Sequence, residues 1–467
     1  MIKNLFFDKG FWRSAITLGL PVALQNLLMS SLALVDTLMI SQLGDIPLSA
    51  VGMAGQLSWM MQLVMFGLIS GSSIFFSQYW GVKDIKGIRR IYGILITFSL
   101  SVAVVFMLTG AFFPKTVISI FNKDPEVIST GADYLRIAVY SYPAIALTGM
   151  FSALLRSTES VKLPMWSSFA SSAMNAILNW CLIYGKLGFE PMGVQGAAIA
   201  TVISSWCGVA ICFGVSLIQR NLVISPLKEV FSYTKEDLAL FFKVSTPVIV
   251  NESMWGLGTV AYNVVFSRMG YEYYAAVSIF RTVDGIMFTF FVGLCNACCV
   301  MVGKSIGAGL IEEAKLTAKR FTFIVPVLSL LTGVSVFLLR NSVVSLFSIT
   351  DSLSETVRIS AATIIGIYGV EYCIRNIPYI QIVGIFRPAG DSAIGMKLDI
   401  LCVWAISLPL TLLSAFVLKL PFPVVFGIML VAEDIAKVPL CIHRYRSEKW
   451  IRPLTEAGKA GMAQAEK

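Results

Sequence analysis

Residues 18–44 read LGLPVALQNLLMSSLALVDTLMISQLG, with Asp36 as the only charged side chain. A helix that crosses a membrane needs about 20 mostly apolar residues. The stretch therefore predicts a membrane-spanning helix that carries one carboxylate. An ionisable group inside a bilayer is costly and is by default a candidate for function.

The composition of the whole chain agrees with this first span. Of its 467 residues, 57% are hydrophobic and 13% are charged, and the mean hydropathy is +0.79. Soluble domains are about 45–50% apolar and about 25% charged. These values exclude a soluble enzyme, a disordered protein and a nucleic-acid binder. The long unbroken apolar runs also argue against a β-barrel, whose strands alternate in polarity.

The apolar runs predict an all-α integral membrane protein with twelve transmembrane helices in two pseudo-symmetric bundles of six. The expected domains are an N-lobe over residues 1–225 and a C-lobe over residues 226–467, joined by the basic stretch 220–243. Prolines inside several spans predict kinks. The helices are expected at 13–40, 48–80, 90–113, 128–155, 163–186, 195–219, 242–267, 277–305, 320–340, 355–386, 396–418 and 422–443.

The distribution of positive charge predicts the orientation. If the N-terminus is cytoplasmic, 25 of the 36 Lys and Arg residues fall in cytoplasmic segments and seven in external ones. Cytoplasmic loops are enriched in Lys and Arg. We therefore expect a multi-pass protein with both termini in the cytoplasm.

The two halves are related by an internal repeat. An offset of 226 residues pairs Pro21 with Pro247, Gly44 with Gly270, Gly67 with Gly293 and Gly81 with Gly307. Six spans in each half would have the same orientation, so the bundles would be related by an axis along the membrane normal, with a central cavity between them. Such doubled bundles suit transport by alternating access.

The cysteines and the histidine do not form a pattern typical of a disulfide framework or a metal site. The nine cysteines are irregularly spaced inside apolar runs, and His443 is the only histidine. No disulfide framework, His-based metal site or cofactor is expected. The Cys295–Cys298 spacing is interpreted as small packing residues in a helix.

Several motifs resemble the multidrug and toxic compound extrusion (MATE) family, in particular its bacterial NorM- and DinF-like members. They are residues 18–44, PMGVQGAAIATVIS at 191–204, and FRPAGDSAIGMKLD at 386–399. The resemblance covers nearly the whole chain and implies the MATE/MOP-type fold. It implies a secondary antiporter, and not an enzyme, that exports amphipathic, mainly cationic drugs or toxic compounds in exchange for H⁺ or Na⁺.

The resemblance also implies a bacterial inner (plasma) membrane location and no cofactor beyond the coupling ion. The expected partners are small amphipathic molecules and membrane lipid, with no nucleic acid and the monomer as the functional form. One loop departs from the family pattern, because Glu159-Ser160 replaces the Gly-Asp that the second half keeps as Gly390-Asp391.

Asp36 and Glu252 are the first candidates for cation coupling, because both lie inside predicted spans. By resemblance, Asp36 matches the first-lobe acid of the family and Glu252 the helix-7 acid of its NorM-type members. The alternative for each is a pair with a buried Arg.

Polar residues near Asp36 extend this candidate site. Asn175 and Asn179 are four residues apart and so share one helix face, and Thr201 lies in the GAAIAT stretch. An alternative of equal weight is that these Asn and Thr side chains only form hydrogen bonds between helices.

The second half has a less regular pattern. Asn376 stands where NorM-type members have an Asp, and an amide cannot titrate. Glu371 is a candidate coupling acid, although its spacing from Arg375 favours a neutralising pair. Arg281 and Asp284 are likewise interpreted as a structural pair.

A substrate cavity is expected near the repeated prolines. Gln25, Asn26 and Asn251 line the cavity or satisfy backbone groups that the prolines free. Met53 and Met287 are candidates for an adaptable apolar wall, against the alternative of core or lipid contact.

Two other functions stay open from the sequence. A flippase for lipid-linked precursors, in the same superfamily, would favour a cavity rich in Arg or Lys. An integral membrane enzyme or receptor would leave the repeat unexplained.

Overall fold

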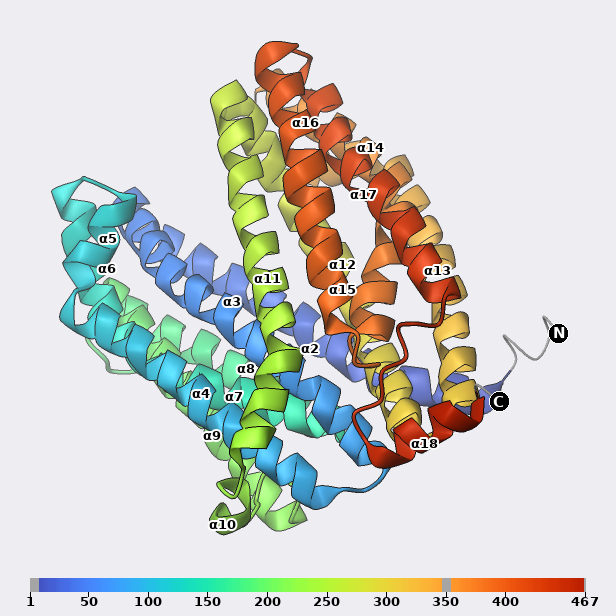
Figure 1. Cartoon of the computed structure of the whole chain (residues 1–467). Coiled ribbons are helices and arrows are strands. Elements are labelled where there is room, and N and C mark those ends of the chain that lie inside the picture. The colour runs from blue at the N-terminus through green and yellow to red at the C-terminus, as the bar shows by residue number, and fades with distance from the viewer. Residues whose placement is uncertain (1–7, 347–353, 466–467) are drawn as a thin grey trace. The chain divides into compact units, whose positions relative to one another are not determined.

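The computed structural model describes residues 8–346 and 354–465, and within these ranges the chain forms helices and no β-strand (Figure 1). Lys3 and Lys467, which were counted for the orientation, lie outside the described residues. All twelve predicted segments are helical, as expected for an apolar chain that must satisfy its backbone groups internally.

The first six predicted segments correspond to long helices and one broken helix. Their bounds are α2 Lys9–Ser41, α3 Asp45–Gly81, α4 Ile85–Phe112, α6 Pro125–Ala138 with η1 Val139–Ser141 and α7 Tyr142–Ser157, α8 Lys162–Tyr184 and α9 Gly193–Gln219. Two short helices, α5 Pro114–Phe121 and α10 Leu227–Val230, lie in the connections.

The second six contain three π-helical segments, η2 to η4. The bounds are α11 Lys235–Met269, α12 Tyr271–Gly307, α13 Ile311–Leu346, α14 Glu355–Tyr379 with η2 Ile380–Phe386, α15 Ser392–Asp399 with η3 Ile400–Ser407, α16 Leu408–Leu412 and η4 Leu413–Val417, and α17 Phe422–Arg446. A further helix, α18 Glu456–Ala465, follows.

The prolines inside the spans act in two ways. Pro21, Pro247 and Pro326 lie within continuous α-helices. Pro378 is the second-last residue of α14, just before the π-helix η2, and Pro409 is the second residue of α16, just after η3. Each proline removes one i→i−4 hydrogen bond near the change between α-helix and π-helix.

Side chains at the helix starts satisfy free backbone N–H groups. Asp84 accepts a hydrogen bond from Gly87 at 2.9 Å, and Asp124 accepts one from Glu126 at 2.9 Å. Asp8 caps α2 in the same way, and the Phe11 N–H and the Arg320 guanidinium hold the pKa of its carboxyl below its usual range. These caps explain why the helices begin at these residues.

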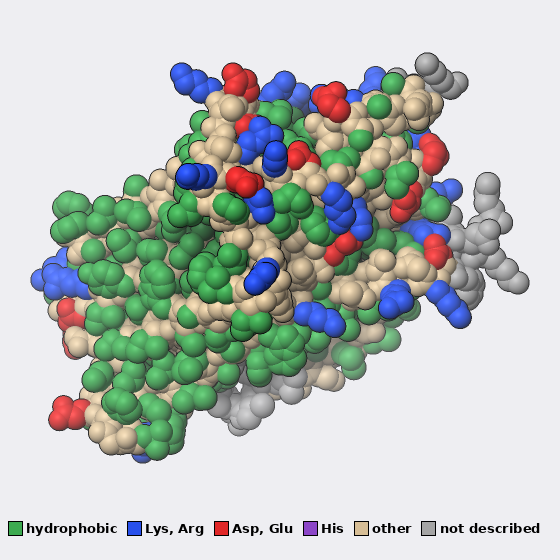
Figure 2. Space-filling model, turned by 90° about the horizontal axis from the view of Figure 1, so that it is seen from below, with side chains coloured by type: hydrophobic (Ala, Val, Ile, Leu, Met, Phe, Trp, Pro, Cys, Tyr) green, Lys and Arg blue, Asp and Glu red, His purple; other side chains and the backbone are tan. Residues whose placement is uncertain are grey.

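Within the described residues, nine helical segments are long and apolar enough to cross a membrane by length and composition. The three long helices outside this set are α8, α11 and α17. Helix α8 carries Asn175 and Asn179, α11 carries Asn251 and Glu252, and α17 carries the segment from Glu433 to Lys437. These three helices therefore hold part of the polar groups described below, and the rest lie on helices within the set of nine. Figure 2 shows hydrophobic side chains covering broad areas of the face in view.

The chain divides into two compact units. One comprises residues 1–20, 77–83 and 243–467, and the other comprises residues 21–76 and 84–242. Helices α2, α3 and α11 each contribute residues to both units. The division of the sequence into lobes 1–225 and 226–467 stays a prediction.

Each unit has its own core. In the unit that holds α4 to α9, Met61, Met65 and Leu135 pack with Tyr142. In the other unit, aromatic rings meet edge to face, as between Phe280 and Phe426 at 5.0 Å. These cores hold the polar side chains of neighbouring helices at fixed separations.

Glycines paired by the repeat have matching structural roles. Gly44 precedes α3 with φ of 112°, and Gly270 precedes α12 with φ of 154°. Gly81 and Gly307 end the same two helices, and a Cβ at either would meet backbone atoms of the other helix. The helix ends therefore pack backbone to backbone, which larger residues would prevent.

The Gly390-Asp391 turn is held by ion pairs. Asp391 is buried, and its carboxylate pairs with Arg444 at 2.6 Å and Arg452 at 3.2 Å. Gly390 has φ of 93° and contacts the backbone of Arg452. The first-half loop keeps a left-handed residue here, with Glu159 at φ of 66°, so the departure from the family pattern leaves a turn of the same hand.

We predict that Gly390→Ala destabilises the protein by about 1–2 kcal/mol or more, because a side chain is strained in the left-handed region and would meet the Arg452 backbone. Thermal unfolding in detergent measures the change. Gly52→Ala is the matched control, since nothing lies within 4 Å of a Cβ at this helical position. An equal loss in both variants would contradict the prediction.

Candidate functional site

Asp36 on α2 faces two amides on α8. The Asn179 side-chain N–H donates to the Asp36 carboxylate and also to the Asn175 oxygen at 3.2 Å. Asn179 is fully buried and Asp36 is half-buried. The structure thus brings together three of the residues proposed from the sequence, and the two amides share a helix face as predicted.

An apolar layer closes one side of this group. Ile40, Ile183 and Ala197 form a buried cluster. Each lies one helical turn from a polar residue of the candidate site, on α2, α8 and α9 respectively. Beyond the layer, Tyr184 donates a hydrogen bond to the Met39 carbonyl at 2.8 Å. The Asp36 carboxylate therefore lies at the boundary between an apolar layer and a polar group of side chains.

Thr201 and Tyr134 lie at the edge of the group. Thr201 donates to the carbonyl of Ala197 on its own helix, at 3.0 Å. Tyr134 on α6 lies beside Thr201, within electrostatic reach of Asp36. Sequence reasoning missed Tyr134, although a polar residue inside a predicted span was an available signal.

Gln25 and Asn26 have different partners. Gln25 on α2 donates to Ser168 on α8 at 2.7 Å, which joins the two helices. Asn26 donates to the Val22 carbonyl on its own helix at 2.9 Å. Pro21 frees the carbonyl of Thr17, four residues before it, so this bond does not decide between the two alternatives, and the role of Asn26 stays a prediction.

A second polar network lies in the other unit, around Arg387. Glu252 on α11 forms an ion pair with Arg387 at 2.6 Å. The same guanidinium donates to the Asn251 oxygen at 3.1 Å. Glu252 is thus neutralised by a buried Arg, which was the alternative to a coupling role.

The network continues from Asn251 to α17. The Asn251 side-chain N–H donates to Asp399. Lys437 pairs with Asp399 at 2.5 Å and with Glu433 at 2.7 Å. Three carboxylates and two cations therefore alternate through the interior of this unit.

Helix α11 is held in register with its neighbours by further hydrogen bonds. Ser392 donates to the Val244 carbonyl at 2.7 Å, and the Trp404 indole donates to the Met254 carbonyl at 3.1 Å. These bonds lie on either side of Asn251 and Glu252 along α11. They keep the two side chains opposite Arg387 and Asp399.

The sequence did not reveal most members of this network. Arg387, Asp399 and Glu433 are not among the site residues proposed from the sequence. Their partners are more than 30 residues away in the chain, except for the pair Glu433–Lys437. The i,i+4 spacing of that pair was the only local signal.

Glu371 lies apart from Arg387. Neither of its carboxylate oxygens has a hydrogen-bond partner among the described residues. The Arg375 guanidinium lies over the Tyr368 ring at 5.4 Å. The predicted neutralising pair is therefore not joined by a hydrogen bond, because Arg375 turns toward an aromatic face.

The other polar residues near Glu371 form local bonds. Asn376 is buried and donates to the Tyr372 carbonyl at 2.9 Å. Asp284 accepts a hydrogen bond from the Tyr368 hydroxyl. It also lies within electrostatic reach of Arg281, to which the sequence paired it.

The proposed methionines occupy different surroundings. Met53 is half-buried and packs against the cluster that contains Met61 and Met65. Met287 is half-buried on α12. Their assignment to a substrate cavity stays a prediction.

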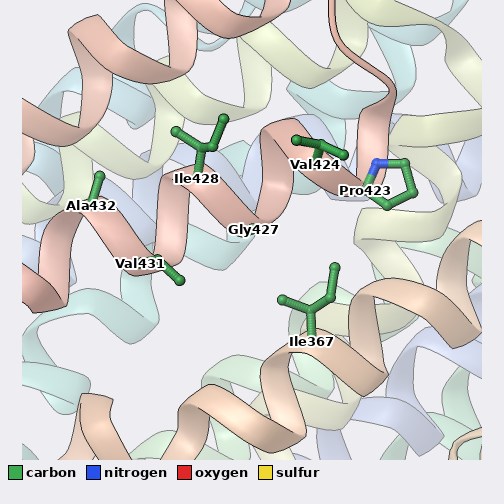
Figure 3. A pocket seen from close by; sticks show the side chains of 7 residues that line it. All are labelled: Ile367, Pro423, Val424, Gly427, Ile428, Val431 and Ala432. Atoms are coloured by element: carbon green, nitrogen blue, oxygen red, sulfur yellow. The ribbon is translucent and has the colours of Figure 1, made fainter.

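An apolar groove lies between α14 and α17 (Figure 3). Its volume is about 460 Å³. The lining residues are Ile367, Pro423, Val424, Gly427, Ile428, Val431 and Ala432. It presents almost no polar surface, so it fits hydrocarbon and not a charged ligand.

All nine cysteines lie within the described ranges, and each is a free thiol. Over the same ranges, the structure contains no group of three or more His, Cys, Asp or Glu side chains placed to hold a metal ion.

Comparison with known proteins finds the same family in both halves of the chain. The family model described as MatE matches residues 21–181 and again 247–413. The two matches begin at Pro21 and Pro247, the pair from which the repeat was inferred. The repeat is therefore confirmed by two matches to one family.

Individual relatives match over nearly the full length. The "Probable multidrug resistance protein NorM" of Thermotoga maritima is 24% identical over 446 residues, covering 94% of this chain and 93% of the relative. A structure of the Vibrio cholerae MATE transporter VcmN in the bent form superposes with a TM-score of 0.84 at 18% identity, covering 97% of this chain and 98% of that one.

A structure described as MATE in complex with MaL6 superposes with a TM-score of 0.83 at 18% identity, covering 96% of this chain and 98% of that one. These likenesses confirm the predicted fold class.

We predict that Arg387→Met destabilises the protein by about 3–5 kcal/mol, because it leaves the Glu252 carboxylate buried and unpaired. The double variant Arg387→Met/Glu252→Gln should recover part of this loss. Thermal unfolding in detergent compares both with Arg358→Met, which removes an exposed Arg and should change the stability by less than about 0.5 kcal/mol. No recovery in the double variant would show that the pair does not explain the loss.

Proposed function

This chain belongs to the MatE family, and on that premise we propose that it exports amphipathic, mainly cationic compounds in exchange for H⁺ or Na⁺. It is a multi-pass membrane transporter of the multidrug efflux type and not an enzyme. Export proceeds by alternating access, in which two bundles rearrange around a cavity.

One observation supports the coupling role of Asp36 above the other candidates. Its described partner is the neutral amide of Asn179, and among the residues described here no Lys or Arg pairs with it. Glu252 has Arg387 as its counter-ion. A carboxylate inside a span without a fixed counter-ion is the better cation-binding group.

The surroundings of Asp36 suit either proposed ion. Binding of a proton requires only the Asp36 carboxylate. A sodium ion prefers several oxygen ligands, as other hard cations do, and the side chains of Asn179 and Asn175 are joined to Asp36 by hydrogen bonds. The Asn179 oxygen has no hydrogen-bond partner among the described residues.

The proposed cavity residues support an amphipathic substrate. Asn26 and Met53 in one unit, and Met287 in the other, are half-buried polar or flexible apolar side chains. Such side chains repack around ligands of different shape. Gln25 donates a hydrogen bond to Ser168, and Asn251 donates one to Asp399. We therefore expect these two side chains to position the neighbouring helices.

The location proposed for the chain is the bacterial inner membrane, with both termini in the cytoplasm and the monomer as the working form. The excess of Lys and Arg in one set of loops supports this orientation. No cofactor is proposed beyond the coupling ion.

We predict that Asp36→Asn lowers gradient-driven efflux of ethidium from proteoliposomes by about a hundredfold, since removing an essential charge abolishes coupling. A pH gradient and a Na⁺ gradient are imposed separately, so the gradient that drives the parent protein identifies the ion. Glu252→Gln should retain part of the activity and lose stability, because it leaves Arg387 without its carboxylate.

Asp45→Asn is the matched control, because it removes an exposed carboxylate at the start of α3 and should transport like the parent. Full activity of Asp36→Asn would contradict the coupling role. Absence of ethidium transport under both gradients in the parent would favour the flippase alternative.

A further inference from the structure

Two buried acids meet away from Asp36 and from the Arg387 network. Glu371 on α14 is 4% exposed and Asp434 on α17 is 5% exposed. Helices α14 and α17 pack against each other, and the Asp434 carboxyl interacts with that of Glu371 across this contact. Two interacting carboxylates in a low-dielectric interior cannot both be ionised without a large cost. One shared proton turns their repulsion into a hydrogen bond.

The part of the chain that the structure describes supplies no donor to the Glu371 carboxylate. Among the described residues, neither Glu371 oxygen accepts a hydrogen bond. A buried carboxylate without donors is rare in folded proteins. A proton on one of the two carboxyls would supply the missing donor.

The charges around the pair are mostly negative. Arg375 on α14 is the nearest cation, and it acts on Glu371, Asp434 and Asp284 together. If all three carboxyls were ionised, one cation would face three anions. A single proton on the pair lowers this imbalance.

The other ionisable groups that face the pair do not neutralise it. Glu433 and Lys437 on α17 pair with each other. Tyr372 and Cys373 are neutral neighbours on α14, and Tyr262 faces Asp434 from α11. On α13, Arg340 packs against Gly366, more than one turn before Glu371.

The apolar groove lies one turn from the acids. Ile367, which lines it, is four residues before Glu371, and Val431 is three residues before Asp434. The groove offers no oxygen ligands to a metal cation. It would admit an apolar reagent to the acid pair from the membrane side.

From these observations we propose that Glu371 and Asp434 form a proton-binding site that holds one proton between them and exchanges it during transport. The site is separate from Asp36 and on another unit of the chain. The exchange step rests on the proposed antiport function, whereas proton binding at the pair does not.

The first test detects the proton without transport. Dicyclohexylcarbodiimide is an apolar reagent that reacts with protonated carboxyl groups. The carboxyl proton moves to a carbodiimide nitrogen while a carboxyl oxygen bonds to the central carbon, so the atoms balance with no other reactant. We expect mass spectrometry of the protein in detergent at neutral pH to find Glu371 or Asp434 modified.

Variants test whether the proton is shared. In Glu371→Gln, modification of Asp434 should be about tenfold lower than the summed modification of the two acids in the parent, because the remaining carboxylate ionises beside Arg375. Glu355→Gln, at the exposed start of α14, should leave it unchanged. Unmodified acids in the parent, or undiminished modification of Asp434 in Glu371→Gln, would overturn the proposal.

Transport tests the exchange step. In Glu371→Gln, ethidium efflux driven by a pH gradient should fall by about tenfold, while ethidium exchange at equal pH stays within about twofold of the parent. The double variant with Asp434→Asn should be no worse, because both residues serve one proton. Unchanged pH-driven efflux would refute the exchange step, and a parent without transport would refute the antiport function while the labelling still decides proton binding.

Discussion

A charged group inside a membrane protein is costly unless the protein supplies a counter-charge or the group binds a mobile cation, because hydrocarbon offers neither. This constraint accounts for the chain of contacts from Glu252 through Arg387 and Asn251 to Asp399 and Lys437. The contacts join α11, α15 and α17, together with the loop after η2. Losing one member would leave a buried charge without its partner, so the packing of this whole unit depends on the set being complete.

The same constraint gives the two halves different chemistry. The repeat places Pro21 and Pro247 at equivalent positions, and polar residues follow both prolines. In the first half, Asp36 meets neutral amides, which leaves its charge available to a mobile cation. In the second half, Glu252 forms an ion pair with Arg387, so its charge is already neutralised within the protein. Similar helices thus support a candidate exchange site in one half and a structural ion pair in the other.

Irregular helix geometry coincides with the ionic network. Arg387 directly follows the π-helix η2, and Asp399 directly precedes η3. A π-helical turn rotates the residues after it relative to an ideal α-helix, and such turns are frequent at functional sites. Pro378 and Pro409 lie within two residues of these segments, and each removes one α-helical hydrogen bond there. The direction of the Arg387 and Asp399 side chains is thereby linked to the backbone of α14 and α15.

Features that depend on neighbouring residues could be predicted from the sequence. These are the twelve apolar helices, the repeat, and the shared face of Asn175 and Asn179, because helix formation and i,i+4 spacing are local. Which distant groups meet depends on the folded structure. Asp399 joins Asn251 and Lys437, and Glu371 faces Asp434 while Arg375 lies over Tyr368. The energy of a charge inside the protein depends on every group packed around it, and residues far apart in the chain supply most of those groups.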